Sequence, residues 1–385
     1  MKTALKNGIR KFLYLVTWLT PKSDTVVLRG FPDYNDNLLA IYDGLIARGT
    51  KRIVWVLEDP AAPPPINIAP GVRLIKYGSL LDILFSTVAR YLFITHGHFL
   101  TEIPPNQICV NLWHGIPFKR IGTALGNPGR LDTLCIATSA FTKRIFADAF
   151  DMPEDRVLIT GQARTDRLFD FDKKTLWNRT LPKYPLPEKV YLWLPTYRQS
   201  PYLAHQQDGR SFGNVFNCSD FSEVEFNSYL AVNNSVCLVK PHPMAKKTDN
   251  ASHSHLHFID EAWMAHHGIT LYQLLGAVDC LISDISSVIT DFLIVDRPVV
   301  LLFEDIEAYG DSRGFMLDPV TDYLPAPVTR SFTEFMGELT KVQEDLDPYR
   351  ERRRRLRDLF FDYNDAKATE RILDRIDEHA SHLEL

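Results

Sequence analysis

The sequence lacks several features that would place the chain in a specialised class of protein. It has no internal repeat, no low-complexity tract and no window of the roughly 20 continuous apolar residues that a membrane-spanning helix needs. Lys and Arg (43 residues) do not outnumber Asp and Glu (48), and the formal net charge of −5 argues against a general polyanion binder such as a nucleic-acid-binding protein. We therefore expect a protein that is soluble or bound to a membrane surface, with no nucleic-acid partner.

Cysteine is also scarce. The chain has five cysteines, an odd number, and none of them forms a CxxC pair. Four of them lie inside apolar runs: Cys109, Cys135, Cys237 and Cys280. This usage predicts buried thiols in a reducing compartment rather than a disulfide scaffold.

Familiar nucleotide-binding and metal-binding motifs are missing as well. There is no GxGxxG segment after the first predicted strand, no GxxxxGK[ST] segment, no HExxH segment and no DxD-type pair of carboxylates at a strand end. We therefore expect the chemistry to depend on basic side chains and helix N-termini, with no cofactor and no protein-bound metal.

What the sequence does contain is an alternation of short apolar runs and helix-like segments. Its 385 residues, 45% hydrophobic and 24% charged, suit two globular domains. The predicted strands are 26–28, 53–57, 72–77, 91–95, 108–112, 134–138 and 157–160, then 190–194, 236–240, 280–283 and 299–303. The predicted helices include 37–48, 80–88, 140–150, 221–231, 271–277 and 286–295. This order predicts an α/β fold with two doubly wound parallel sheets and a ligand-binding cleft at the strand carboxyl ends.

Composition also indicates where the domains end. The segment 169–189 interrupts the alternation with charged residues and prolines and is predicted to link two domains. The polar stretch 199–218 is predicted to be a long loop near the cleft. The chain is thus divided into an N-terminal segment (1–22), a first doubly wound domain (23–170), a second (185–345) and C-terminal helices (346–385).

The first 22 residues form a basic and apolar segment. Apolar residues recur at helical spacing: Leu5, Ile9, Phe12, Val16 and Leu19. Basic residues surround them: Lys2, Lys6, Arg10, Lys11 and Lys22. Such a helix can lie in the headgroup layer of a membrane, with its basic side chains on anionic lipid. The same stripe fits a helix packed on its own domain, and a signal peptide is a third interpretation, although no small-x-small cleavage site precedes Pro21.

The first chemical motif is Trp-His-Gly-Ile-Pro-Phe-Lys-Arg-Ile-Gly, residues 113–122. It follows a predicted strand, and Gly115 allows a sharp turn while Pro117 stiffens the loop. His114 is therefore expected at the carboxyl end of a strand, where an imidazole that titrates near neutrality can act as a base. Lys119 or Arg120 could contact a phosphate. A histidine that only hydrogen-bonds its own loop explains the motif equally well.

A second motif, Val-Lys-Pro-His-Pro at residues 239–243, ends another apolar run. Two prolines restrict the backbone around His242, and Lys240 supplies a point charge. Structural loops use such sequences too, so the stronger indication is the pair of histidines. Each predicted domain carries one histidine at a strand end, and both can face one cleft.

The third motif begins at Ser283, where a strand runs into small polar residues and then an apolar helix. Asp284 or Ser286 is a natural N-cap. Free N–H groups at such a helix start, together with the hydroxyls of Ser286 and Ser287, can bind phosphate. Asp291 follows on the same predicted helix. A well-capped helix without a ligand is the plain alternative.

Three shorter segments also place charged side chains just after predicted strands. Arg164 lies near Asp166, and Arg198 follows the first strand of the second half. Asp305 follows the last predicted strand, where a carboxylate can hold ribose or alcohol hydroxyls. Each of these segments also fits a turn or a surface ion pair.

In their order and spacing, these motifs resemble the CDP-glycerol glycerophosphotransferase family, the teichoic acid primases and polymerases. The family's Trp-His-Gly-x-Pro-x-Lys-x-x-Gly pattern is matched without a gap at residues 113–122, Lys-x-His-Pro at 240–243 and Arg-Gly-Phe at 313–315. Gly-x-Pro-Arg-x-Asp is matched with Ala163 for proline, and Pro-Thr-Trp-Arg with Tyr197 for tryptophan. Ser-Asp-Tyr-Ser-Ser-x-x-x-Asp is matched from Ser283 with isoleucine for tyrosine.

The resemblance implies a GT-B fold, in which two Rossmann-like domains face each other across a cleft. Residues 23–170 would receive the acceptor, and residues 185–345 would bind the nucleotide. It also implies the reaction: an alditol phosphate, with glycerol phosphate as the first candidate, passes from a CDP-alditol to a hydroxyl of a lipid-linked saccharide or polymer, and CMP is released. The implied place is the cytoplasmic face of a bacterial cell membrane, where the enzyme is peripheral.

The same resemblance implies roles for individual residues. His114 would be the base that takes the proton of the acceptor, and His242 would contact the diphosphate and stabilise the charge that develops there. The other candidates would bind substrate: Lys119, Arg164, Arg198, Lys240, Asp284, Ser286, Ser287, Asp291 and Asp305. For Asp284 and Asp291, a helix cap and a packed helix carboxylate are equally good explanations.

Two other functions stay open at this point. A sugar-transferring GT-B glycosyltransferase also binds a nucleotide diphosphate, but it would release a nucleoside diphosphate rather than CMP. A non-catalytic nucleotide-binding scaffold is a different class, although it has no need of two loop-constrained histidines. Because the family's polymerases usually carry a long extra N-terminal segment, the length of 385 residues favours a primase-like enzyme that adds one unit, or a compact transferase.

Overall fold

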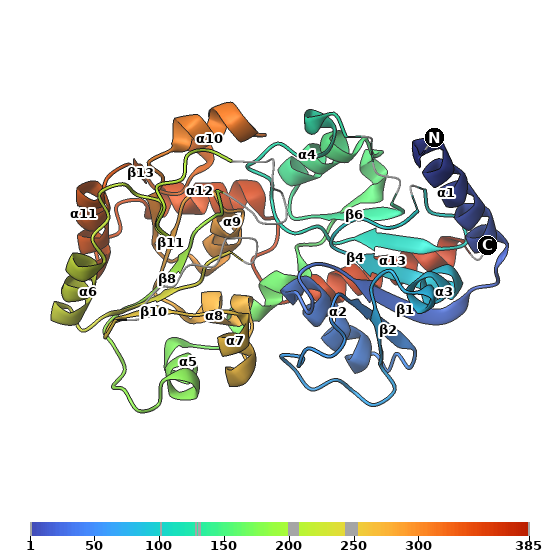
Figure 1. Ribbon diagram of the computed structural model, residues 1–385, viewed down its shortest axis with the longest axis horizontal. Helices are drawn as coiled ribbons and strands as arrows, with labels where there is room; N and C mark the ends of the chain where they lie inside the picture. Colours follow the sequence, from blue (N-terminus) through green and yellow to red (C-terminus); the bar gives the residue numbers. More distant parts are fainter. Residues whose placement is uncertain are drawn as a thin grey trace. The chain divides into compact units, whose positions relative to one another are not determined.

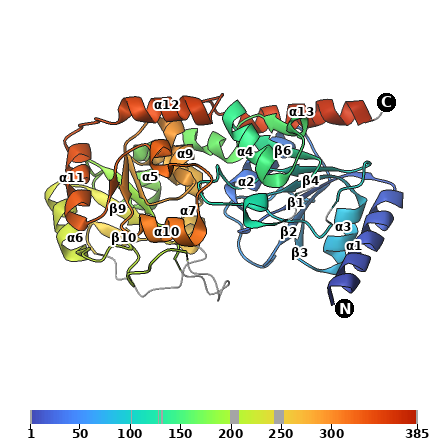
Figure 2. The ribbon, with the colours of Figure 1, turned by 90° about the horizontal axis from the view of Figure 1, so that it is seen from above.

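The computed structural model describes residues 2–100, 102–127, 129, 132–198, 208–242 and 253–383 (Figures 1 and 2). By their internal contacts, the residues form two compact units. Unit 1 comprises Met1–His114, Gly122–Arg167 and Phe360–Leu385, and unit 2 comprises Gly115–Ile121 and Leu168–Leu359. The loop that follows His114 therefore belongs to unit 2, and the end of the chain belongs to unit 1.

Unit 1 is built on a seven-stranded sheet with the order β3-β2-β1-β4-β5-β6-β7, and all of its strand pairs are parallel. Its strands are β1 (Ser23–Arg29), β2 (Ile53–Leu57), β3 (Arg73–Lys76), β4 (Ala89–Ile94), β5 (Ile108–Asn111), β6 (Leu134–Ala137) and β7 (Val157–Ile159). Its helices are α1 (Lys2–Leu19), α2 (Asp36–Ala47), α3 (Leu80–Val88), α4 (Ala140–Phe150), α13 (Ala368–Leu383), and the 3-10 turns η1 (Gly122–Leu125), η2 (Glu154–Arg156) and η3 (Ala163–Phe169). Each strand that the apolar runs of the first half predicted is present.

Unit 2 contains a six-stranded parallel sheet with the order β10-β9-β8-β11-β12-β13. Its strands are β8 (Val190–Leu194), β9 (Val236–Val239), β10 (Leu256–Phe258), β11 (Cys280–Ser283), β12 (Val299–Leu302) and β13 (Val328–Thr329). Its helices are α5 (Lys173–Thr180), α6 (Glu223–Val232), α7 (Glu261–His267), α8 (Leu271–Ala277), α9 (Val288–Phe292), α10 (Ile306–Arg313), α11 (Phe332–Gln343), α12 (Arg350–Phe360), and the 3-10 turns η4 (Leu293–Val295) and η5 (Val320–Tyr323).

Both sheets have the strand order of a doubly wound fold, in which the chain starts in the middle, winds to one edge and then returns to wind to the other. The direction reverses between β1 and β4 in unit 1, and between β8 and β11 in unit 2. The connections leave these switch points towards opposite faces of the sheet, so that the strand carboxyl ends are left uncovered there. The predicted α/β fold with two doubly wound parallel sheets is confirmed.

The last helix completes the core of unit 1. In α13, Ile372, Leu373 and Ile376 are buried in the apolar cluster around Trp55, and Figure 2 shows α13 running beside α2. Asp166 accepts hydrogen bonds from the backbone N–H groups of residues 368 and 369, both at 2.8 Å, and so fixes the start of α13. The carboxylate that the sequence places near Arg164 therefore holds a helix end.

Several local expectations were wrong. The predicted linker 169–189 contains α5, whose Leu176 and Trp177 are buried against unit 2, because its charged residues and prolines hide a short apolar face. The single helix predicted at 286–295 is divided into α9 and η4. The edge strands β10 and β13 were not predicted, because three and two residues are too short for a recognisable apolar run.

The apolar stripe of the N-terminal segment faces outward. In α1, Ile9, Phe12, Val16 and Leu19 are 36–71% exposed, whereas Thr17 is buried. The stripe therefore does not pack on unit 1, and the interpretation that it does was wrong for these four residues; the side chain of Leu5 lies outside the described part of the chain. No described helix is long and apolar enough to span a membrane.

Lys22, expected among the lipid-facing basic residues, has an internal role instead. Its ammonium group donates to the carbonyl oxygen of Thr17 at 2.6 Å and to that of Thr87 at 2.7 Å. It thereby joins the last turns of α1 and α3, where the negative ends of the two helix dipoles favour a cation. Burial lowers the pKa of Lys22 to about 8.

The motif loop returns to unit 1 through a very close contact at Gly122. Its φ is +54°, and a Cβ atom at this position would lie 1.8 Å from the carbonyl oxygen of Ala149 in α4. Gly126 also has a positive φ, +71°, but a Cβ atom there would meet none of the described residues within 4 Å. A comparison of substitutions at the two glycines therefore distinguishes the cost of a left-handed backbone from the cost of the steric overlap.

We predict that Gly122→Ala lowers the free energy of unfolding by about 3 kcal/mol or more, because the left-handed backbone and the overlap with Ala149 both oppose a side chain. Gly126→Ala should cost only the roughly 1–2 kcal/mol of a left-handed non-glycine residue. Urea unfolding followed by tryptophan fluorescence measures both. Equal losses in the two variants would show that the α4 contact does not constrain the loop.

Candidate active site

The predicted site residues fall into two groups, one at the switch-point edge of each sheet. The group in unit 1 surrounds the carboxyl ends of β4 and β5. The exposed ring of His114 has its Nδ1 atom 3.0 Å from the carbonyl oxygen of Thr95, and it stacks on the ring of His96 with centroids 4.5 Å apart and an interplanar angle of 5°. A ring nitrogen facing a carbonyl oxygen carries the proton, so the lone pair of the neutral ring is on Nε2. This is the tautomer that a base needs.

The backbone before His114 has a strained, left-handed conformation. Trp113 has φ +53°, and its N–H donates to Oδ1 of Asn111 at 3.0 Å. The carbonyl oxygen of Trp113 accepts a 3.0 Å hydrogen bond from Nδ2 of Asn37, whose Oδ1 in turn accepts the backbone N–H of Arg164 at 3.0 Å. Strain of this kind costs about 1–3 kcal/mol and persists only where neighbours fix it. Asn37, which is buried, therefore ties the His114 loop to η3.

Sequence reasoning missed two of these residues. His96 belongs to a Thr-His-Gly-His segment that directly follows a predicted strand, which is a signal of the same kind as the one that identified His114. Asn37 carries no such signal, because an asparagine near the start of a helix is ordinary and its partners are 76 and 127 positions away. Arg164 is buried beside this asparagine in η3.

The group in unit 2 is centred on Arg198, just after β8. Its buried guanidinium group donates through Nε and Nη2 to the two carboxylate oxygens of Asp305, at 2.7 and 2.8 Å, and through Nη1 to Asp284 at 2.9 Å. Asp305 also accepts the backbone N–H of Arg210 at 2.9 Å and Nδ2 of Asn217 at 3.0 Å. The polar atoms of Arg198 and Asp305 thus satisfy each other within one buried network.

Asp284 links this network to the turn after β11. It accepts hydrogen bonds from the backbone N–H of Thr196 at 3.1 Å, from the Thr196 hydroxyl at 2.6 Å and from the N–H of Ile285 at 2.7 Å. Burial alone would raise the pKa of Asp284, but Arg198 and these hydrogen bonds outweigh it and hold the pKa below its ordinary value. Asp284 is therefore an ionised part of the network.

The expected N-cap at this turn is not formed. The residue before α9 is Ser287, whose side chain makes no capping hydrogen bond. The hydroxyl of Ser286 accepts the N–H of Val288 only at 3.4 Å, and Asp284 is engaged with Thr196 and Arg198. Ser286 and Ser287 are half-buried at the carboxyl edge of the sheet.

Lys119 reaches unit 2 because its loop pairs with the Arg-Gly-Phe segment. The N–H of Arg120 donates to the carbonyl oxygen of Gly314 at 3.2 Å, and the N–H of Met316 donates to that of Phe118 at 2.8 Å. The ammonium group of Lys119 then lies 5.8 and 5.4 Å from the ring centroids of two tyrosines, Tyr197 and Tyr309. Burial lowers the pKa of Lys119 to about 8.

His242 completes this positive patch. Its ring centroid lies 4.9 Å from that of Tyr197. Although the side chain is exposed on one side, its crowded surroundings, followed by the charges of Lys119 and Lys240, lower its pKa to about 3. The imidazole is therefore neutral at physiological pH and is positioned where neighbouring cations create a positive potential, which an anion would relieve.

The two remaining predicted residues are engaged with protein groups. Lys240 is buried and donates to Glu261 of α7 at 2.7 Å. Asp291 is fully buried in α9 and accepts a hydrogen bond from the hydroxyl of Tyr272 in α8. Both lie deeper in unit 2 than the half-buried Ser286.

Metal-ligand atoms come together at one place among the described residues. Cys218, Asp220 and Glu304 have potential ligand atoms within 4.8 Å of one another. Burial raises the pKa of the Cys218 thiol, and its Sγ atom donates to Asp220 at 3.0 Å. A protonated thiol is a poor metal ligand, because metals bind the thiolate.

Two doubly wound units with polar switch points define the class of the protein: it is a two-domain α/β protein with the GT-B fold. The chain belongs to the CDP-glycerol:poly(glycerophosphate) glycerophosphotransferase family, whose model matches residues 12–378. The resemblance read from the motifs is thereby confirmed.

Relatives of similar length act in teichoic acid synthesis. The chain is 23% identical to the teichoic acid glycerol-phosphate transferase of Staphylococcus aureus, over 97% of this chain and 99% of that protein. It is 24% identical to the teichoic acid ribitol-phosphate primase of Bacillus spizizenii, over 97% and 96% of the two chains. Of the S. aureus ribitol-phosphate polymerase TarK, at 28% identity, it spans only 56%.

Solved structures agree with the fold. The structure of a variant of the wall teichoic acid polymerase TagF matches with a TM-score of 0.76 at 24% identity, covering 98% of this chain and 94% of that one. The UDP-GlcNAc 2-epimerase of Neisseria meningitidis matches with a TM-score of 0.52 at 12% identity, covering 92% and 99%.

Proposed function

We propose that the protein transfers an alditol phosphate, with glycerol phosphate as the first candidate, from a CDP-alditol to a hydroxyl of a lipid-linked saccharide or polymer. The observation that carries this proposal is the single loop 113–122. It bears a base-competent His114 in unit 1 and, five residues later, Lys119 beside His242 in unit 2. Five residues span at most about 18 Å even when fully extended, so the chain itself keeps the base near the anion-binding patch.

Unit 2 is proposed to bind the donor. The diphosphate of the CDP-alditol needs cations and N–H donors around its oxygens, which Lys119 and the neutral His242 can supply. The hydroxyls of Ser286 and Ser287 are proposed to bind the phosphates or the alditol end. Arg198, Asp284 and Asp305 neutralise one another, so we assign them to positioning this surface rather than to direct charge stabilisation.

Unit 1 is proposed to activate the acceptor. Nε2 of His114 takes the proton as the acceptor hydroxyl attacks the phosphorus that carries the alditol. The bond between that phosphorus and the oxygen of CMP breaks, and CMP leaves with the electron pair. Lys119 and His242 stabilise the charge that accumulates on the departing phosphate, and Arg164, held beside the His114 loop through Asn37, supports the acceptor side.

The direct test supplies CDP-glycerol, CDP-ribitol and a panel of nucleotide sugars with a short-chain synthetic lipid-linked disaccharide. We expect CMP and a product heavier by alditol phosphate, because attack occurs at phosphorus. Release of a nucleoside diphosphate from a nucleotide sugar means attack at a sugar carbon, and it would establish a glycosyltransferase instead. The product mass also shows whether one unit or several are added.

We predict that His114→Ala and His242→Ala each reduce turnover by at least about a hundredfold while the fold persists, because positioned proton transfer and electrostatic stabilisation are each worth about that much. His266→Ala, which removes an exposed histidine on α7, is the matched control and should keep normal turnover. Circular dichroism and the unfolding midpoint verify the fold. Near-normal turnover in the His114 variant would remove the assignment of the base.

The lowered pKa of Lys119 predicts an alkaline limb in the pH profile. Its ammonium group is present below a pKa of about 8 and is lost as the pH rises through that value, so kcat/KM for the CDP-alditol should fall above pH 8. Lys119→Gln should lower kcat/KM at pH 7 by about 10- to 100-fold, since it removes a charge-assisted contact, and should abolish the limb. An unchanged limb in this variant would assign the titration to another group.

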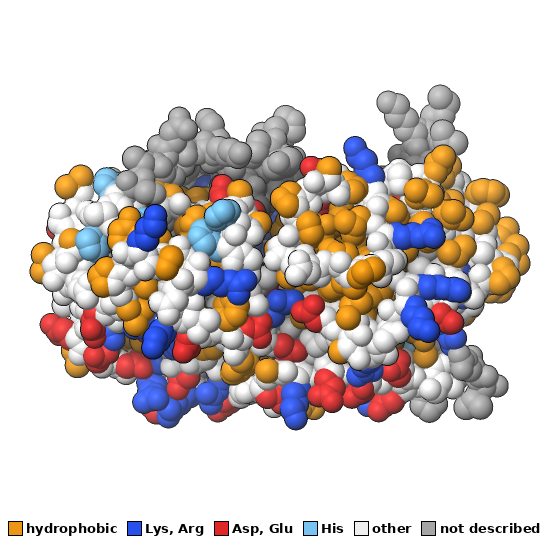
Figure 3. Space-filling model, turned by 90° about the horizontal axis from the view of Figure 1, so that it is seen from below, with side chains coloured by type: hydrophobic (Ala, Val, Ile, Leu, Met, Phe, Trp, Pro, Cys, Tyr) orange, Lys and Arg blue, Asp and Glu red, His pale blue; other side chains and the backbone are white. Residues whose placement is uncertain are grey.

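We also propose that unit 1 contacts an anionic membrane through an apolar surface on α1 and α3. The α1–α3 surface comprises the exposed residues Ile9, Phe12, Leu15, Val16, Trp18, Leu19, Leu80, Leu81 and Leu84. In α3 the polar side chains of Asp82, Ser86 and Thr87 are buried, the reverse of a water-facing helix. Figure 3 shows apolar side chains gathered with Lys and Arg over this part of unit 1, the composition of an interfacial surface.

We predict that Leu80→Asp reduces co-flotation of the protein with vesicles containing anionic lipid at least about fivefold, because it places a charge in the apolar contact. Val232→Asp is the matched control: Val232 on α6 is 86% exposed and Leu80 is 85% exposed, but α6 belongs to unit 2. Equal flotation of the two variants would exclude the α1–α3 surface as the membrane contact.

A further inference from the structure

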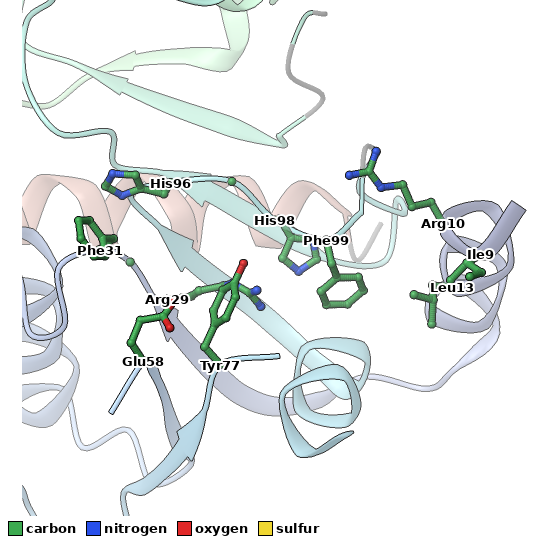
Figure 4. Close-up of a pocket in the computed structure, with 12 residues that line it drawn as sticks. Ile9, Arg10, Leu13, Arg29, Phe31, Glu58, Tyr77, His96, His98 and Phe99 are labelled. Atoms are coloured by element: carbon green, nitrogen blue, oxygen red, sulfur yellow. The ribbon is translucent and has the colours of Figure 1, made fainter. Parts of the chain in front are cut away.

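A cavity of about 780 Å³ opens at the switch point of unit 1 (Figure 4). Residues that follow β1, β2, β3 and β4 form one side of it, and α1 contributes to the other. This is the place where a doubly wound sheet binds its ligand, because the connections on either side diverge. The side chains that determine its chemistry are Arg10, Arg29, Phe31, Tyr77, His96 and Phe99.

A buried cation lies at the edge of this cavity. Arg29 is the last residue of β1 and is only 5% exposed. One of its nitrogens donates to Asp82 at 2.8 Å, while its Nε atom is buried without a hydrogen-bond partner among the described residues. Asp82 is shared with two other donors, since its carboxylate also accepts hydrogen bonds from the N–H of Gly78 at 2.8 Å and from the hydroxyl of Ser86 at 3.2 Å. The guanidinium group therefore has capacity left for an anionic ligand.

Aromatic faces and a second guanidinium group surround this cation. The guanidinium carbon of Arg29 lies 4.4 Å from the ring centroid of Tyr77 and 5.9 Å from that of Phe99. Arg10 extends from α1 to the same cavity (Figure 4). Flat apolar faces combined with a few charged groups suit a ligand with sugar rings and phosphates, whose rings stack and whose oxygens accept from guanidinium groups.

The position of the cavity connects the base with the α1–α3 surface. His96 lines the cavity and stacks on His114, so the cavity begins beside the base. At the other side, Leu13 and Ile9 of α1 line the cavity, and α1 also carries the exposed apolar stripe. A ligand that fills the cavity therefore extends from the base to the helix that is proposed to contact lipid.

We propose that this cavity is the acceptor subsite and that it binds the saccharide and diphosphate of a lipid-linked saccharide. The order of groups in such a molecule matches the order of groups along the cavity. The reactive hydroxyl is directed towards His114, the sugar rings stack on Tyr77 and Phe99, the phosphates accept from Arg29 and Arg10, and the lipid leaves along α1. This assignment rests on the proposed function, because it takes the substrate class from it.

The kinetic test uses Arg10→Gln and Tyr77→Ala with a water-soluble, short-chain saccharide diphosphate as acceptor and no vesicles, so that membrane binding does not contribute. Each variant should raise KM for the acceptor about tenfold and leave kcat and KM for CDP-glycerol within about twofold. Lys11→Gln changes the same charge on the next residue of α1, which is exposed and outside the cavity, and Tyr184→Ala removes an exposed tyrosine of unit 2. Both controls should behave as the wild type. Arg29 is left intact, because its loss would strand the buried Asp82.

A binding measurement separates this inference from the proposed function. Calorimetry without donor compares the saccharide diphosphate with the same saccharide lacking the diphosphate. The wild type should prefer the diphosphate, Arg10→Gln should reduce that preference about tenfold, and Tyr77→Ala should weaken both ligands. Normal CMP release with unchanged acceptor KM and affinity in both variants would overturn the cavity assignment and leave the function standing. If the variants weaken binding of the saccharide diphosphate but no CDP-alditol yields CMP, the proposed function would be overturned and the assignment of the cavity as a saccharide diphosphate site would stand.

Discussion

Parallel strand order is the constraint on which the functional residues depend. In both sheets all strands run in one direction, so every carboxyl end lies at the same edge, and connections diverge at one point along it. Strand interiors are covered on both faces and are almost entirely apolar, as in β2 and β8. Polar and charged side chains can be accommodated only where the strands end. Arg29 and His114 occupy such positions in unit 1, and Thr196 and Asp284 occupy them in unit 2.

Charge at the unit 2 edge is divided between two tasks. Arg198 is shared by Asp284 and Asp305, and removal of one partner from such a buried pair costs about 3–5 kcal/mol, because the other charge is left uncompensated. This network holds the backbones after β8, β11 and β12 together. Among the described residues, the ammonium group of Lys119 makes no hydrogen bond to a carboxylate and lies over the rings of Tyr197 and Tyr309 instead. Burial lowers its pKa. The proposed binding of the donor by Lys119 and the positioning of these backbones by Arg198 thus depend on different cations.

The sequence predicted every strand except the edge strands β10 and β13, and it predicted the strand-end motifs, because those signals are local. Runs such as 53–57 and the segment 113–122 contain their own information, and both sheets apart from β10 and β13 follow from them. The partners across the sheets could not be predicted in this way, since Asn37 meets Trp113 and Arg198 meets Asp305 over more than 70 positions of chain. The direction of the α1 stripe was equally undetermined, because periodicity shows that a helix has an apolar face without showing what covers it. The catalytic and substrate-binding roles of all the candidate residues, Arg164 and Asp291 among them, stay predictions.

The loop of residues 113–122 passes from unit 1 into unit 2 and back, so one short sequence motif supplies side chains to both units. Its first part is fixed in unit 1 by Asn37 and by the stacking of His96 on His114, and its middle pairs with residues 314–316 of unit 2. Gly122 then returns the chain to α4 with no room for a side chain. Under the proposed function, this short, doubly anchored segment limits how far the base His114 can move from Lys119, and such a limit reduces the entropy that is lost when two groups are brought together. The proposed role of His114 therefore depends on backbone geometry at three positions of positive φ, Trp113, Gly115 and Gly122, as much as on the imidazole itself.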